Sequence, residues 1–445
     1  MPSDLRRLTG LAAALPAEFQ TDTLLQIVES RGGLNADLKR DLIEQASTLA
    51  RRAKYAYPKV AVRGLNADSR QAFEANVLSL KLDRLSLEMR AIRDLLPLDP
   101  VAARRMFQQV QKPVLEAGTC GNALVPQLDD YFEAGALVVT RGFGPKEIER
   151  EEHVALALQI VTGVKAPYEV APAARMVVET RLAPAQFEAV LNAFTARLEA
   201  VGMDDRAFTE TAVVTQTEIA SVAGKAASLG VSRGTLSRAY RKYLTSHYGA
   251  ARCAESPGGA GPVEWFNQSD LRGGLAVIEL KELNAKAVEG KLAVDGFWTT
   301  PDSERILNGA REVRVSPSGA VYSAPERAAS EWTRKLEDFL GRLGGWKQSG
   351  EESALDFFHQ KATVYESLID VCPSGERRVR LINGFVSFLN GADAIGESPV
   401  DWFWHVQNLH RRLRQAGDRD AERLMGAYRA SGNLIMEVYA ELVGG

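Results

Sequence analysis

Apolar residues recur with helical spacing through the first 110 residues of the chain. The clearest stripe has intervals of four, three, four, three and four residues and consists of Leu78, Leu82, Leu85, Met89, Ile92 and Leu96. This spacing predicts one long helix with a single apolar face. The helix should end at Pro97, because proline disfavours a helical conformation in the residue before it. Asp99 and Pro100 then predict the cap and first turn of a helix over 101–110.

Shorter helices are predicted before this stripe, over residues 22–31 and 37–53. Gly32 and Gly33 should end the first of them, and Asn35 should cap the second. Short helices joined by short polar turns pack as antiparallel hairpins. No repeat of fixed period is visible, so a degenerate solenoid and an irregular bundle both stay open.

The helical pattern continues over most of the remaining chain. A helix is predicted from about Lys146 to Val161, and further helices lie between residues 171 and 248, including an amphipathic one over 184–201. Helices return from residue 328 to the end. Ser353 and the Ser398-Pro399 pair have the chemistry of N-terminal caps there.

The helical pattern is interrupted between residues 253 and 327. The loop-forming sequence SPGGAGP covers residues 256–262, and a short strand is predicted over 275–280. Residues 312–315 and 320–323, joined by Ser-Pro-Ser-Gly, predict a small β-hairpin.

The sequence therefore predicts an all-α protein. Its antiparallel helical hairpins should form an irregular stack that is either solenoid-like or bundle-like. One small insertion should be irregular and partly β. Four segments are expected: N-terminal helical hairpins over 1–110, a middle helical region over 111–252, the insertion over 253–327, and a C-terminal helical bundle over 328–445.

Composition narrows the possible functions only modestly. The 57 acidic and 54 basic residues nearly cancel, which argues against a dedicated nucleic-acid coat or a membrane-surface binder. No apolar run is long enough to span a membrane, so a soluble protein is expected. The N-terminus is interrupted by Gly10 and Pro16 and lacks the strength of an export signal. We expect a cytoplasmic protein from the chain as given, and an exported one if an upstream signal is missing.

The three cysteines, Cys120, Cys253 and Cys372, are too few and too scattered for a zinc site or a disulfide framework. Buried reduced thiols are the expected state, and one disulfide is the alternative if the protein is exported.

One segment has the spacing of a helix-turn-helix. In KAASLGVSRGTLSRAY, which begins at Lys225, Ala226 permits close helix approach, Gly230 permits a left-handed turn, and Leu236 anchors the second helix. The side chains available to a DNA major groove would be Ser232, Arg233, Thr235, Ser237 and Arg238. The alternative is two core helices joined by a glycine turn, and the nearly neutral charge favours it.

An aromatic cluster is the second candidate for a binding site. Trp402, Phe403 and Trp404 are consecutive, so on a helix they cannot all face one core. At least one is therefore expected on an exposed rim or at a second interface, where aromatic anchors are enriched in protein complexes. Packing between helices on two sides is the alternative.

No residue pattern predicts catalysis, a cofactor or a metal. Glu149 and His153 are four residues apart and should share a helical face, but the two-histidine zinc-protease pattern is absent, and a solvated ion pair is the simpler interpretation. His405 and His410 are five apart and diverge too far around a helix for a shared metal. His247 and His359 have no evident partners in the sequence.

Several segments carry a family resemblance when they are taken in order. They are TCGNALVP at Thr119, REEHVALALQIV at Arg150, RAYRKYLTSHYGAARC at Arg238, DFFHQKATVYESLI at Asp356 and ESPVDWFWH at Glu397. Together they resemble an uncharacterised family of mostly helical bacterial proteins with no assigned activity, and the likeness spans nearly the whole chain. The resemblance implies that residues 238–253 form a structural helix followed by the insertion. Proteins of that family often carry an export signal, and this chain as given does not show one.

The leading functional hypothesis is a non-catalytic helical scaffold that binds a protein or peptide partner, as helical stacks present extended surfaces. A DNA-binding regulator that uses the helix-turn-helix at 222–242 is the alternative. An enzyme of unrecognised type, with an active site assembled from distant residues, is the third.

Overall fold

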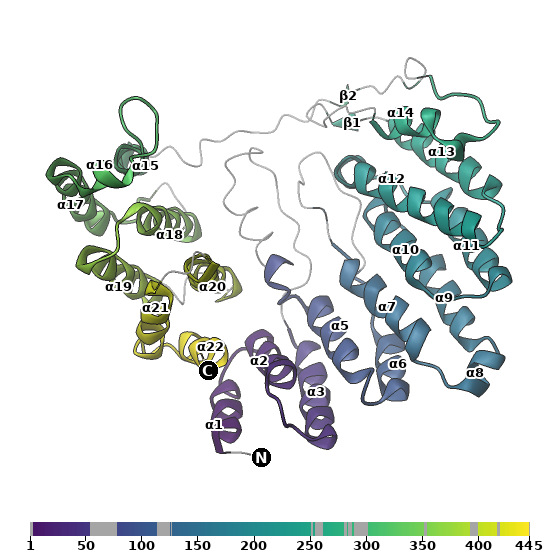
Figure 1. Ribbon diagram of the computed structural model, residues 1–445, viewed down its shortest axis with the longest axis horizontal. Coiled ribbons are helices and arrows are strands. Elements are labelled where there is room, and N and C mark those ends of the chain that lie inside the picture. The colour runs from purple at the N-terminus through teal and green to yellow at the C-terminus, as the bar shows by residue number, and fades with distance from the viewer. Residues whose placement is uncertain are drawn as a thin grey trace. The chain divides into compact units, whose positions relative to one another are not determined.

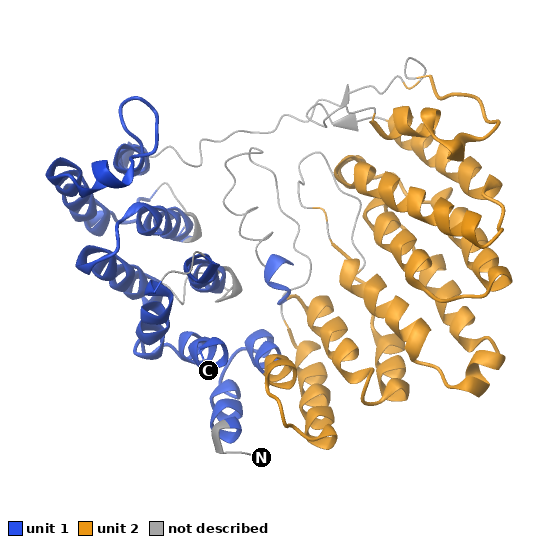
Figure 2. Ribbon diagram, in the orientation of Figure 1, with its two compact units in different colours: residues 1–23, 63–82, 293–445 blue, residues 24–62, 83–292 orange. Residues whose placement is uncertain are grey.

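The computed structural model describes residues 3–53, 78–113, 125, 127–250, 252–253, 261–279, 283, 287–288, 301–350, 354–391, 399–415 and 419–444. Contacts group the chain into two compact units (Figure 2). Unit 1 contains residues 1–23, 63–82 and 293–445, and unit 2 contains residues 24–62 and 83–292. The described secondary structure is helical apart from two strands of two residues each (Figure 1), which confirms the predicted all-α class.

Unit 2 is a succession of helices with a short irregular end. Its elements are α3 (Ala36–Ala50), α5 (Arg84–Leu95), α6 (Pro100–Gln109), α7 (Asp129–Arg141), α8 (Pro145–Glu149), α9 (Glu152–Thr162), α10 (Pro167–Glu179), α11 (Pro184–Leu198), α12 (Asp205–Ser228), α13 (Gly234–Gly249), β1 (Arg252–Cys253), α14 (Gly261–Gln268), the 3-10 helix η1 (Asp270–Arg272) and β2 (Ala287–Val288). The two strands pair in parallel, with Arg252 opposite Ala287. Helix α2 (Ala17–Ser30) has residues in both units.

The helices of unit 2 stack as hairpins in two layers. The pairs are α5 with α6, α7 with α9, α10 with α11, and α12 with α13. First helices contact first helices along the series α5, α7, α10 and α12, and second helices do the same along α9, α11 and α13 (Figure 1). Each hairpin therefore buries its apolar faces against the hairpins before and after it, as expected for a helical stack.

Helix α10 lies at the centre of unit 2 and contacts α7, α11 and α12. It is buried on nearly every side from Pro167 to Val177. Ala173 and Ala174 have no exposed surface, and their small side chains allow neighbouring helices to approach closely. Burial of this apolar surface stabilises the stack by about 25 cal/mol for each Å² removed from water.

Unit 1 follows the same pairing scheme. Its helices are α1 (Ser3–Ala12), α15 (Pro301–Arg314), α16 (Ala324–Ala328), α17 (Ser330–Gly345), α18 (Ala354–Val371), α19 (Glu376–Asn390), α20 (Pro399–Gln415), α21 (Asp420–Arg429) and α22 (Leu434–Val443). Helix α15 pairs with α17, α18 with α19, and α20 with α21, while α1 contacts α22. The N-terminal end of the chain joins this core, because the Phe19 and Phe403 rings meet edge to face with centroids 5.0 Å apart.

Two helix starts agree with their predicted caps. Asn35 accepts a hydrogen bond from the Leu38 amide at 2.8 Å, and Asp99 accepts one from the Ala102 amide at 2.9 Å. These carboxylate and amide oxygens satisfy backbone donors that a helix start leaves without partners. The predicted caps Ser353 and Ser398 lie outside the described residues.

Two predicted long helices are each broken in the structure, and those two predictions were wrong. The stripe that begins at Leu78 is interrupted at Lys81, whose φ of 54° is left-handed, and α5 starts afresh with Asp83 as its cap. The helix predicted from Lys146 to Val161 is divided into α8 and α9 at Glu151, whose φ is 56°. Apolar spacing continues across both breaks, so periodicity alone hides them.

The predicted β content of the insertion was also wrong in detail. The described residues 275–279 form no strand. Helix α15 extends to Arg314, so the predicted hairpin is reduced to a single antiparallel bridge between Val315 and Val321. The Ser316–Gly319 turn is present, and Gly319 takes a φ of 85° that favours glycine.

Candidate functional site

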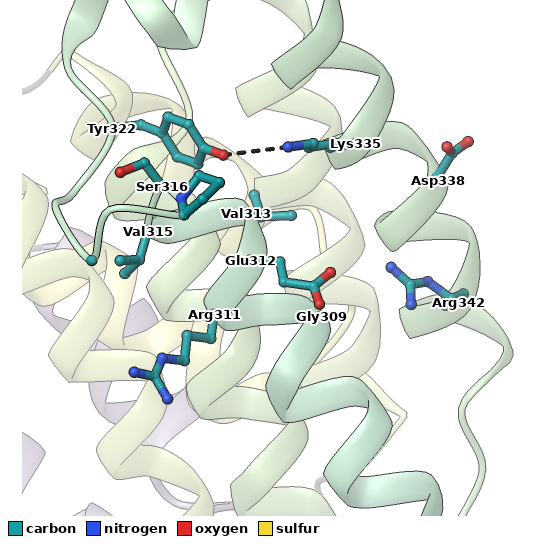
Figure 3. Close-up of a pocket in the computed structure, with 12 residues that line it drawn as sticks. Gly309, Arg311, Glu312, Val313, Val315, Ser316, Tyr322, Lys335, Asp338 and Arg342 are labelled. Atoms are coloured by element: carbon teal, nitrogen blue, oxygen red, sulfur yellow. Dashed lines mark hydrogen bonds between the residues drawn. The ribbon is translucent and has the colours of Figure 1, made fainter.

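A pocket of about 580 Å³ opens in unit 1 where α15 meets α17 (Figure 3). The end of α15, the Ser316–Gly319 turn, Tyr322 and three side chains of α17 form its wall. The two helices approach closely at Gly309, where a β-carbon would lie 2.8 Å from ring carbons of Phe339. Glycine at this position therefore determines how α15 sits against α17 at the base of the pocket.

Five charged side chains line this pocket, here called the α15–α17 pocket. Three are basic and two acidic: Arg311, Lys335 and Arg342, with Glu312 and Asp338. The Lys335 ammonium donates to the Tyr322 hydroxyl at 3.4 Å (Figure 3), and this contact raises the pKa of Lys335. Among the described residues, the other four make no hydrogen bond or ion pair with the protein. The pocket therefore presents charges of both signs that are available to a ligand.

A second group of ionisable side chains lies in the core of unit 1, between α18 and α20. Glu366 is 4% exposed, and its Oε1 accepts from His405 Nδ1 at 2.8 Å. The other ring nitrogen of His405 lies 3.2 Å from His359 Nδ1. Asn408 donates to the second oxygen of Glu366 at 3.0 Å. We call this set the Glu366 network.

Burial perturbs one member of this network, His359. The pKa of His359 is lowered to about 3, mainly by burial and to a smaller extent by the neighbouring His405. The side chains of His405 and Glu366 are almost fully enclosed, and they bond to one another rather than facing the α15–α17 pocket. This arrangement suits a structural polar network inside the core, in which buried groups are satisfied by partners.

The predicted helix-turn-helix covers the end of α12, a turn that contains Gly230, and the start of α13. Gly230 takes the left-handed φ of 69° that the pattern requires, and Leu236 is fully buried. Ser232 and Arg238 are exposed, while Arg233 and Thr235 are partly covered.

The face of α13 that would read bases is partly occupied by its own chain. Ser237 is 5% exposed, and its hydroxyl lies 3.5 Å from the Arg272 carbonyl. One turn later the Arg241 guanidinium donates to the Ala276 carbonyl at 3.2 Å. Helices α11 and α14 and η1 also contact α13. These contacts cover part of the surface of α13.

The aromatic cluster lies mostly in the core of unit 1. Trp402 is 1% exposed, and its indole N–H donates to the Leu389 carbonyl at 2.7 Å. Phe403 is 2% exposed and meets the rings of Phe19 and Tyr439. Trp404 is partly exposed and packs against the His405 ring. Two of the three rings therefore pack in the core, and the third, Trp404, keeps part of its surface exposed.

The other sequence candidates are not brought together as a site. Glu149 ends α8 and His153 lies in α9, so the two residues do not share one helical face. Cys372 is buried with a free thiol, Cys120 lies outside the described residues, and only the backbone of Cys253 is described. In the described part of the chain, no three or more histidine, cysteine or acidic side chains form a cluster fit for a metal.

Sequence reasoning missed both ionisable groups of unit 1. A signal for the Glu366 network was present, because His359 and Glu366 are seven residues apart and so lie on one face of α18. His405, Asn408 and Arg412 likewise follow one face of α20 at spacings of three and four. No comparable signal exists for the α15–α17 pocket, whose residues come from two helices and a turn.

Comparison with known proteins gives no further guide to function. No family model, curated protein or solved structure matches this chain. Among the described helices, none combines the length and apolar character needed to cross a bilayer.

Proposed function

We propose that this chain is a non-catalytic helical scaffold that binds a protein or peptide partner, with the α15–α17 pocket as the docking site. The observation that carries the proposal is the set of four charged side chains in that pocket that make no hydrogen bond or ion pair with the described residues, although the Arg342 guanidinium also lies over the Phe339 ring. Complementary charges on a ligand would select its orientation and speed its association.

The pocket also offers apolar and aromatic surface for a peptide. Tyr322 contributes a ring to its wall and Pro317 a rigid edge. Val321, next in sequence to Tyr322, is 63% exposed. Aromatic side chains are favoured at protein interfaces because they contribute large contact areas with few rotatable bonds. A peptide that carries one acidic, one basic and one apolar side chain matches this combination.

The alternatives receive less support from the geometry. DNA binding through α13 would need Ser237 and its neighbours to be free, whereas Ser237 is buried beside η1. An enzyme would need acid–base groups that face a substrate, whereas the histidines of the Glu366 network bond within the core.

The proposal is tested by selecting binders from a random displayed-peptide library with the purified full chain. Dissociation constants of selected peptides are then measured by fluorescence anisotropy for wild type and for Glu312→Gln/Arg342→Gln. We expect this pocket variant to bind at least about fivefold more weakly, which is about 1 kcal/mol.

The matched control is Glu304→Gln/Arg334→Gln, which removes the same charges from exposed positions of the same two helices outside the pocket. It should bind within about twofold of wild type, as surface substitutions away from a site have small effects. If no peptide is enriched, or if both double variants bind as tightly as wild type, the pocket is not the docking site.

A further inference from the structure

A second cavity in unit 1 has a strongly basic lining. It measures about 340 Å³ and lies between α16, α17 and the loop that joins α18 to α19. Its wall contains three arginines and one carboxylate: Arg327 from α16, with Arg377, Arg380 and Glu376 from α19. We call it the arginine cavity. None of its residues belongs to the α15–α17 pocket.

Arg327 is held in the wall of the cavity with part of its hydrogen-bonding capacity unused. One terminal nitrogen, Nη1, donates to the Val371 carbonyl at 3.0 Å. Its Nε is buried and has no acceptor among the described residues. A buried donor without an acceptor is destabilising. Because Nε is enclosed, the donors that Arg327 offers to the cavity are the remaining N–H groups of its terminal nitrogens.

The other two arginines share a single acceptor. Arg377 Nε and Arg380 Nη2 each lie 3.1 Å from the same oxygen of Glu337. A guanidinium has five N–H donors, so most of the donors on both side chains stay available. Even with Glu337 and Glu376 counted, the three arginines leave a positive excess at the cavity.

The backbone at the start of α19 adds a further contribution. Gly375 precedes the helix with a φ of 142°, a conformation that side chains disfavour, and it supplies no side-chain cap. The first amide donors of α19 are therefore not capped by a side chain. Such donors and the helix dipole favour negative charge at this end of a helix.

We infer that the arginine cavity binds a tetrahedral oxyanion of the phosphate type, either free phosphate or the phosphate group of a small phosphomonoester. Arginine forks match phosphate oxygens in bidentate pairs, and several oxygens can accept from several directions at once. The three arginines and the uncapped start of α19 offer donors of this kind.

The inference is tested by isothermal titration calorimetry of the full chain with inorganic phosphate and, separately, with O-phosphoserine at low salt. We expect saturable binding that weakens at least tenfold in Arg327→Gln and in Arg380→Gln. Arg334→Gln is the matched control, because Arg334 is an exposed arginine of α17 outside the cavity, and it should bind like wild type. Tighter binding of phosphoserine than of phosphate would identify an ester as the ligand, and the reverse would identify the free anion.

Absence of binding by wild type at millimolar concentrations of both ligands would overturn the inference. So would an equal loss in Arg334→Gln and the two cavity variants, because general charge would then explain the binding. Circular dichroism and the thermal midpoint check that each variant folds. Arg380 is exposed, so its variant keeps the test valid if Arg327→Gln is unstable. The result does not depend on whether a peptide binds the α15–α17 pocket.

Discussion

Lys225 is half-buried and donates to main-chain carbonyls. Lys225 Nζ donates to the carbonyls of Val177, Val178 and Thr180 at 3.2, 2.5 and 2.6 Å. These groups lie at the C-terminal end of α10, where a helix leaves its last carbonyls without partners. Burial lowers the pKa of Lys225. The residue that opens the helix-turn-helix pattern in the sequence is thus used as a cap for another helix.

His359 should make the folded state sensitive to acid. Its pKa is about 3 in the folded protein and 6.5 in its ordinary state, so between these values the unfolded chain binds a proton that the folded chain does not. His359 alone should therefore lower the free energy of unfolding by about 1.4 kcal/mol for each pH unit between 6.5 and about 3. His359→Gln removes this contribution, and urea unfolding at several pH values between 4 and 7 measures it.

His410 also has a pKa lowered by burial, and it provides the comparison. It contacts Tyr439 rather than the Glu366 network, so its contribution should persist in the His359→Gln protein. The free energy of unfolding of the wild type should therefore fall more steeply with decreasing pH than that of His359→Gln. Two parallel stability curves would show that His359 is protonated equally in both states, contrary to the expectation.

The sequence predicted the roles of those residues that act on neighbouring residues of the chain. Asn35 and Asp99 cap the helices that follow them, because a cap needs only neighbouring backbone amides. The partner of His359 could not be predicted in this way. It lies 46 residues away on α20, and only the packing of two helices brings the rings together.

At the scale of elements, helix existence was predictable and helix continuity was not. The left-handed residues Lys81 and Glu151 are neither glycine nor asparagine, and each lies within an uninterrupted apolar pattern. Non-glycine residues adopt positive φ only rarely, so the sequence carries no warning at these positions. Tertiary packing decides where the helix stops.

The contact between α15 and α17 gives an element-scale prediction. Gly309→Ala would place a β-carbon 2.8 Å from the Phe339 ring, so the helices must separate. We expect a loss of about 1–3 kcal/mol in the free energy of unfolding, typical of an overpacked core. Chemical unfolding followed by circular dichroism measures this loss, and peptides selected on the α15–α17 pocket should also bind less tightly.

Gly341→Ala on α17 is the matched control for this substitution. Nothing lies within 4 Å of the β-carbon it would add, so no neighbour must move. Replacing a helical glycine by alanine should then stabilise the protein by up to about 1 kcal/mol. If both substitutions change stability in the same direction, the close approach at Gly309 is not what determines the outcome.

For the molecule as a whole, the pairing of successive helices was the most predictable property. Short turns between amphipathic helices predicted hairpins, and the contacts within each unit follow that scheme. The grouping of residues 1–23 with residues 293–445 was not among the segments expected from sequence. Contacts between chain ends leave no mark in local composition, so the sequence offered no basis for it.

Net charge and the covering of α13 lead to a prediction for DNA. The formal charge of −3 and the burial of Ser237 predict no salt-dependent binding to a labelled random duplex. Fluorescence anisotropy at about 50 and 200 mM salt measures this, since phosphate contacts weaken steeply over that range. Binding at low salt that Arg233→Ala/Arg238→Ala abolishes would instead favour the regulator.

The Glu366 network has a consequence for where its protons reside. An ionised Glu366 can only accept, so His405 must carry its proton on Nδ1. With His405 neutral, its Nε2 accepts and His359 must hold its own proton on Nδ1. With His405 charged, the same bond reverses and His359 becomes the Nε2 tautomer. While both hydrogen bonds are kept, the tautomer of the His359 ring therefore reports the charge of the His405 ring on the other helix.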